Sequence, residues 1–233
     1  MINSLDIQRL REEFSSADPF PHIVIDNFLS EEVLAQVLAE FPKPDSELFT
    51  WKSNDKNSVK LMCQDRKLIK KLPIIDKVID ALNSRTFLEE LASITNMPTL
   101  YGDDELAGGG LHQIKAGGFL QLHVDFNVAD TLPDLHRRLN IILFLNEEWE
   151  SSWNGQLELW NKDCTECIVS VEPVLNRAVI FDTQPIGDRL PWHGHPTPLT
   201  CPEGITRKSL ALYYYTKEPS ASILSEKHKT LYK

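Results

Sequence analysis

The stretch Gly117-Gly118-Phe119-Leu120-Gln121-Leu122-His123-Val124-Asp125 is the place in the sequence where the spacing of residue types implies a specific chemistry. Side chains alternate between the two faces of an extended strand. Gln121, His123 and Asp125 are therefore expected on one face, and Leu120, Leu122 and Val124 on the opposite, core-facing side. An imidazole and a carboxylate two residues apart can reach a single ion, although a His-x-Asp tripeptide alone is a weak signal.

The segment from Asp188 to Thr216 supplies a candidate third metal ligand and a basic residue. It contains His193 and, fourteen residues later, Arg207, in a predicted strand where Arg207 and Ser209 share a face. One distant His completes a two-His-one-carboxylate set, which leaves open coordination positions and suits non-haem Fe(II). His195 follows His193 on the same face and is the alternative third ligand, with His193 preferred.

Together these residues resemble the prolyl-4-hydroxylase-like branch of the 2-oxoglutarate and Fe(II)-dependent dioxygenases. That family has His-x-Asp, a distal His some tens of residues later, and then a basic residue that pairs with the far carboxylate of 2-oxoglutarate. The matching residues are His123-x-Asp125, His193 and Arg207-x-Ser209, with strands at Arg138 to Asn146 and Asn176 to Phe181 between them. The resemblance spans about Pro19 to Thr216.

The resemblance implies that His123, Asp125 and His193 hold Fe(II), with 2-oxoglutarate and O2 as co-substrates. Arg207 is expected to make a charge-assisted pair with the distal carboxylate of 2-oxoglutarate, and Ser209 to add a hydroxyl donor. The implied reaction is hydroxylation of an unactivated C–H bond, coupled to decarboxylation of 2-oxoglutarate to succinate and CO2. An aspartate at position 125 favours hydroxylation over halogenation in this family.

Further polar residues are expected in the pocket. Asn140 interrupts an apolar run, and because a buried Asn needs partners, we expect it to face the interior and bind the co-substrate or a backbone group. The family often has a Tyr nine residues before its first ligand, where this chain has Ile114, so Gln113 or Tyr101 is expected to compensate. The residues expected to line the substrate pocket are His195, Asn127, His112 and Trp192.

The expected fold is mostly β with flanking α-helices. Short strands at about ten-residue spacing predict a sandwich or barrel, and the resemblance implies a double-stranded β-helix, or jelly roll, with helices packed on its outer sheet. We expect one domain over 1–233, with largely helical support at 1–100, the core at 101–216 and a tail at 217–233. Apolar stripes predict helices near 4–14, 30–41, 74–82 and 87–94, and the polar stretch 44–64 predicts a loop.

Charge, apolar runs and cysteine content indicate which binding partners and which cellular compartment to expect. The formal charge of −10, from 34 acidic and 24 basic residues, argues against nucleic acid as a partner and so against nucleobase repair. The absence of an apolar run of membrane-spanning length and of a signal peptide predicts a cytoplasmic protein without a membrane partner. Cys164 and Cys167 have zinc-ribbon spacing but no second pair, so reduced thiols beside a hairpin turn are expected.

The substrate is left open by the sequence, as is the oligomeric state. The leading hypothesis is an amino-acid side chain in a peptide or protein, with prolyl suggested by the resemblance. The alternatives are a small molecule, such as a free amino acid or secondary metabolite, and a non-catalytic sensor or cupin-like metal binder. The expected pair of Arg207 and Ser209, which would bind a carboxylate, argues against a protein that only stores metal, because metal storage does not require a carboxylate-binding site.

Overall fold

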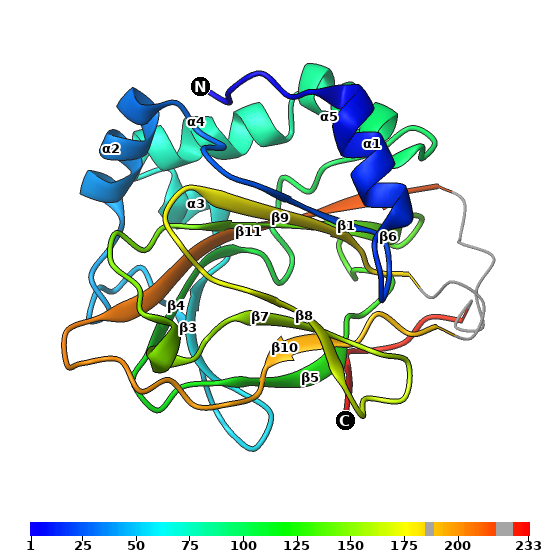
Figure 1. Ribbon diagram of the computed structural model, residues 1–233. Helices are drawn as coiled ribbons and strands as arrows, with labels where there is room; N and C mark the ends of the chain where they lie inside the picture. The colour runs from blue at the N-terminus through cyan, green and yellow to red at the C-terminus, as the bar shows by residue number, and fades with distance from the viewer. Residues whose placement is uncertain (185–188, 218–225) are drawn as a thin grey trace.

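The computed structural model describes residues 1–184, 189–217 and 226–233, which form two antiparallel sheets, with helices on the outer side of the larger one (Figure 1). The larger sheet has the order β1-β9-β6-β11-β4-β3-β2 and the smaller sheet β12-β5-β10-β7-β8. The strands are β1 His22–Ile25, β2 Trp51–Asn54, β3 Val59–Cys63, β4 Gly110–Lys115, β5 Leu120–Val124, β6 His136–Phe144, β7 Leu157–Trp160, β8 Cys167–Val171, β9 Arg177–Asp182, β10 His193–His195, β11 Thr206–Thr216 and β12 Leu231–Tyr232. The prediction of a jelly-roll core is confirmed.

Helices cover the outer face of the larger sheet, as Figure 1 shows. They are α1 Ile7–Ser16, α2 Glu31–Glu40, α3 Arg66–Ile69, α4 Pro73–Leu82 and α5 Arg85–Thr95, with a short 3-10 helix at Ser151–Trp153. The four helices expected from the sequence are all present. In α4 the buried side chains recur at helical spacing and make one apolar stripe, consisting of Ile75, Val78, Ile79 and Leu82. These stripes, and not helix propensity, hold such short helices in place.

The main core lies between these helices and the outer face of the larger sheet. Alternate residues of the two central strands supply it, namely Leu139, Ile141 and Leu143 from β6 and Leu210, Leu212 and Tyr214 from β11. The period of two leaves the intervening residues of both strands facing the smaller sheet. A second apolar cluster, including Phe144, Leu159 and Phe181, fills part of the space between the sheets. Because these apolar side chains cannot hydrogen-bond, polar residues that face the inter-sheet space need one another or a bound molecule as hydrogen-bond partners.

The stretch 44–64, predicted as a loop, contains a β-hairpin instead. Trp51 pairs with Met62 and Asn54 with Val59, and β3 then pairs with β4. The prediction was wrong because β2 is an edge strand, exposed at every position except Ser53, so it has no apolar alternation. The first hundred residues thus supply three strands of the larger sheet in addition to helices.

The segment expected as a C-terminal tail includes an edge strand of the smaller sheet. Leu231 and Tyr232 form β12, which pairs with Val124 and His123 of β5. The Tyr232 ring centroid lies 5.7 Å from that of His123. The end of the chain therefore lies directly beside the strand that carries the predicted metal ligands.

The remaining predictions about the framework concern the cysteines and membranes. Cys164 lies in the turn of the β7–β8 hairpin and Cys167 is the first residue of β8, and all four cysteines are free thiols. Among the described residues, neither Cys164 nor Cys167 belongs to a group that could hold a metal ion. No helix in the described ranges combines the length and the apolar character needed to span a bilayer.

Candidate active site

The three predicted metal ligands meet at the centre of the smaller sheet. His193 of β10 pairs directly with His123 of β5, and Asp125 follows the end of β5. One ligand atom from each side chain lies within 4.8 Å of the other two, and all three residues are buried. Of the two candidates for the third ligand, His193 is the one that joins this group.

Backbone carbonyls fix the orientation of both imidazoles. Nδ1 of His123 donates to the carbonyl of Gln121 and Nδ1 of His193 to that of Pro191, each at 2.9 Å. Since a carbonyl can only accept, the proton of each neutral ring lies on Nδ1 and the lone pair on Nε2. The two Nε2 atoms lie 3.6 Å and 3.3 Å from the Asp125 carboxylate. Such fixed rings are typical of metal-binding histidines.

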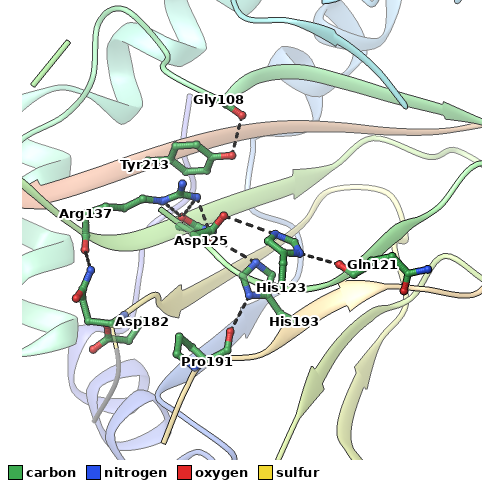
Figure 2. A network of polar contacts seen from close by, with 11 residues as sticks. Gly108, Gln121, His123, Asp125, Arg137, Asp182, Pro191, His193 and Tyr213 are labelled. Atoms are coloured by element: carbon green, nitrogen blue, oxygen red, sulfur yellow. Dashed lines mark hydrogen bonds and ion pairs between the residues drawn. The ribbon is translucent and has the colours of Figure 1, made fainter. Parts of the chain in front are cut away.

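The Asp125 carboxylate is held from its other side (Figure 2). Its Oδ2 accepts from Arg137 at 2.9 Å and from Asn140 Nδ2 at 2.9 Å. Arg137 also donates to Asn140 Oδ1 through Nε and Nη2, at 2.9 Å and 2.7 Å. With both donors on Oδ2, the Oδ1 atom remains for a metal ion. Burial is the largest single influence and raises the pKa of Asp125, but the Arg137 charge and the two imidazoles together hold this pKa well below its usual range.

Arg137 was not predicted as a site residue, although the run His136-Arg137-Arg138 stands out in the sequence. Its side chain is 1% exposed and lies between aromatic rings, 3.3 Å from the Tyr213 centroid and 4.5 Å from that of Phe126. Arg137 and Asn140 are three residues apart and would face opposite ways in a regular strand. A β-bulge changes this: Tyr214 pairs with Leu139 and Tyr215 with Arg137, so Arg138 is an extra residue in β6. The bulge therefore brings Arg137 and Asn140 to the same inner face.

Arg207 occupies the far side of the same cavity. It is 5% exposed, its Nε donates to the carbonyl of Gly155 at 2.7 Å, and its guanidinium lies 4.8 Å from the Phe144 centroid. Among the described residues it has no carboxylate within salt-bridge distance, and burial lowers its pKa to about 9. Because a buried cation without a counter-ion is costly, this position favours an anionic ligand. Ser209, expected beside it, also lines the cavity.

Two other histidines lie in this cavity with unpaired ring nitrogens. Both nitrogens of His195 and Nε2 of His112 are buried without a hydrogen-bond partner. Burial lowers the pKa of His112 to about 3 and that of His195 well below the usual value, so both are neutral at pH 7. Buried polar atoms normally have partners, so these nitrogens are available to a bound molecule. Both residues line the cavity, and their expected role in binding substrate stays a prediction.

The structure corrects several other predicted pocket residues. Gln113 lies on the opposite face of β4 from His112 and Ile114, where its Nε2 donates to Thr206 Oγ1 at 2.8 Å, so it does not line the cavity. Asn127 binds the C-terminal segment through the carbonyl of Glu226 and the amide of His228.

Trp192 is also outside the cavity lining, and its ring lies near Lys233. Asn140 faces inward as expected, but its partners are Asp125 and Arg137 in place of a backbone group. Leu120, expected on the opposite face, lines the cavity in place of Gln121, because the β5–β10 register shifts between His193 and His195.

The cavity that joins these residues has a volume of about 260 Å³. Among the wall residues that sequence analysis did not assign to the site are Trp51, Lys60, Thr230 and Tyr232. They come from the β2–β3 hairpin and the C-terminal segment, the two regions whose structure was predicted wrongly. A second cavity of about 500 Å³ adjoins the first, sharing Gln64, Gly108, Phe126 and Thr230 with it.

Residues 109–215 match the family model of the 2OG-Fe(II) oxygenase superfamily, and this range contains all three predicted metal ligands and Arg207. The chain carries a 2OG-Fe(II) oxygenase domain. This oxygenase is a 2-oxoglutarate-dependent dioxygenase, and its family uses Fe(II), 2-oxoglutarate and O2. A search among curated proteins gives no significant sequence match.

Solved structures share the fold of the oxygenase at low sequence identity. A prolyl hydroxylase from Trichoplax adhaerens, in complex with a hypoxia inducible factor peptide fragment, has 17% identity and a TM-score of 0.53, covering 90% of each chain. A Pseudomonas putida prolyl-4-hydroxylase has 14% identity and a TM-score of 0.55, covering 91% of this chain and 99% of that one. A Phytophthora capsici prolyl 4-hydroxylase has 20% identity and a TM-score of 0.59, covering 92% and 67%.

The donors in the cavity fit both groups that the family uses. Two imidazole nitrogens and one carboxylate oxygen are the ligand set of non-haem Fe(II) oxygenases, in which open positions remain for co-substrates. The Arg207 guanidinium, which has no carboxylate partner among the described residues, fits one carboxylate of 2-oxoglutarate. The candidate donors for iron and for the co-substrate therefore lie in one cavity.

Replacing Asn140 with alanine is expected to weaken metal binding about 10- to 100-fold, the usual effect of removing a residue that orients a metal ligand. Ferrous iron titrated under argon against a coloured chelator measures this affinity. Asn146→Ala is the matched control, because Asn146 is also buried and bonds Pro173 and Lys208 outside the cavity. Both variants should lose stability, but equal metal affinities in both would contradict the role of Asn140.

Proposed function

We propose that this oxygenase hydroxylates an unactivated C–H bond of an amino-acid side chain in a peptide or protein, with the prolyl ring as the first candidate. The observation that carries this proposal is that His123, Asp125 and His193 line one cavity together with Arg207, a buried cation that has no carboxylate partner among the described residues. The fold similarity to prolyl hydroxylases, one of them in complex with a peptide fragment, supports the choice of substrate class.

In this proposal each part of the cavity has a separate task. His123, Asp125 and His193 hold Fe(II), which together with 2-oxoglutarate and O2 supplies the oxidising power. Arg207 binds the distal carboxylate of 2-oxoglutarate, and Arg137 with Asn140 keeps the Asp125 carboxylate ionised and oriented. One oxygen atom of O2 enters the substrate as hydroxyl, and the other enters succinate as 2-oxoglutarate loses CO2.

The shape of the site supports an extended substrate. The second cavity continues from the first along the segments 105–108, 126–131 and 227–230. Together the two cavities offer more room than a single amino-acid side chain requires. A peptide could therefore place one residue near the metal ligands while its neighbours occupy the adjoining space.

The test supplies the protein with Fe(II), 2-oxoglutarate, air and a library of proline-containing peptides. Succinate release that requires iron and O2, with a peptide mass gain of about 16 Da per turnover from one oxygen atom, is the expected result. Succinate release coupled to free amino acids but to no peptide would assign a small-molecule substrate. The absence of succinate with every substrate, despite binding of 2-oxoglutarate, would contradict catalysis and indicate a sensor.

A further inference from the structure

Lys60 lies in the same row of the larger sheet as Arg207. On β3, Leu61 pairs with Gln113, which places Lys60 beside Ile114, and Ile114 pairs with Arg207 on β11. Residues directly opposite each other in a sheet project to the same face, and strands lie about 4.8 Å apart. Lys60 and Arg207 thus point into one cavity from strands roughly 10 Å apart.

The Lys60 ammonium has no anionic partner among the described residues. The ammonium makes a cation–π contact with the Trp51 ring on β2, with Nζ 5.8 Å from the ring centroid. Trp51 is 39% exposed and Lys60 is partly exposed, so this pair marks the mouth of the cavity, whereas Arg207 is deep. Burial lowers the pKa of Lys60 to about 8, despite the opposing influence of Asp125. Lys60 is therefore still mostly protonated at pH 7.

The charges in the cavity do not balance, even with iron and co-substrate bound. The charged lining residues are Lys60, Arg137, Arg207 and Asp125. Asp125 is neutralised by Arg137, and the two charges of ferrous iron equal those of the 2-oxoglutarate dianion. These charges therefore leave a net +2, from Arg207 and Lys60. Arg207 contacts the distal carboxylate in this arrangement, whereas Lys60, at the mouth, has no anion beside it. His112 adds no charge, because burial lowers its pKa to about 3.

We propose that Lys60 binds a carboxylate of the substrate, so that this oxygenase selects substrates with an acidic group close to the oxidised carbon. The inference rests on the proposed function and specifies its substrate class. The carboxylate can be an acidic side chain flanking the target residue in a peptide or the α-carboxylate of a free amino acid. An exposed aromatic ring beside the ammonium provides an apolar contact for the neighbouring part of either substrate.

Binding measured under argon separates recognition from turnover. The protein, loaded with Fe(II) and 2-oxoglutarate, is titrated calorimetrically with peptides in which one glutamate or one glutamine stands within three residues of a proline. A second arm compares free L-proline and other L-amino acids with their amides. The variants are Lys60→Gln and Lys60→Arg, with Lys52→Gln as the control. Lys52 is exposed on β2 and does not line the cavity, so its replacement removes the same charge from the same hairpin.

In wild type, at least one acidic probe should bind about tenfold more tightly than its neutral counterpart, as expected for a partly buried charge pair. Lys60→Gln should remove this preference, whereas Lys60→Arg and Lys52→Gln should keep it. The arm in which the preference occurs identifies the source of the carboxylate.

The proposal is overturned if no acidic probe exceeds its neutral counterpart, or if the preference survives in Lys60→Gln. An equal loss of 2-oxoglutarate affinity in Lys60→Gln would also overturn it, because Lys60 would then bind the co-substrate. Failure of the proposed function has a different signature, namely no iron- and O2-dependent succinate from any substrate. The two failures are therefore distinguishable.

Discussion

Replacing Arg207 with alanine is expected to weaken 2-oxoglutarate binding roughly 30- to 1,000-fold, corresponding to ~2–4 kcal/mol for loss of one partner of a buried charge pair. Iron binding should change little, because Arg207 lies across the cavity from the metal ligands and makes no contact with them. Titration of 2-oxoglutarate and of ferrous iron, each under argon, measures the two affinities separately.

Arg207→Lys is the informative comparison for this prediction. It keeps the charge but loses the planar fork and the bond from Nε to the carbonyl of Gly155, so it should restore only part of the affinity. A parallel loss of iron and 2-oxoglutarate binding in Arg207→Ala would indicate a general collapse of the cavity and contradict the clamp.

His193→Ala is expected to lower kcat/KM by at least about 1,000-fold, or ~4 kcal/mol, because it removes one of three metal ligands. His195→Ala should retain iron binding and measurable turnover. The two rings differ in their hydrogen bonds. His193 donates to the carbonyl of Pro191, whereas both ring nitrogens of His195 lack a hydrogen-bond partner. Iron affinity and succinate release are measured for both variants under the same conditions.

The opposite pattern would reassign the third ligand. If His195→Ala lost iron and His193→Ala kept it, the β5–β10 register at His123 would have to differ from the one described here. Equal and small losses in both variants would mean that neither histidine is a ligand. Thermal melting of both variants identifies any loss that arises from unfolding.

The parts of the site that sequence analysis predicted depend on regular strands. His123, Asp125, His193 and Arg207 reach the cavity because strand alternation and antiparallel pairing work as expected at these positions. The helices could also be predicted from the sequence, because α1, α4 and α5 bury apolar side chains at helical spacing.

The missed parts depend on irregular or polar strands. Alternation places Arg137 and Asn140 on opposite faces, and only the bulge in β6–β11 pairing brings them together on Asp125. The edge strand β2 carries no apolar pattern, so the hairpin that places Trp51 and Lys60 at the cavity was predicted as a loop. Tyr232 reaches His123 through a two-residue strand, which is too short for a sequence pattern.

The most direct test of the central claim is an anaerobic titration of the protein with ferrous iron and 2-oxoglutarate. If His123, Asp125 and His193 bind the iron and Arg207 positions 2-oxoglutarate beside it, a visible charge-transfer band should appear in wild type and be absent from His123→Ala. A wild-type protein that shows no band with both present, or a band of undiminished intensity in His123→Ala, would contradict the assignment.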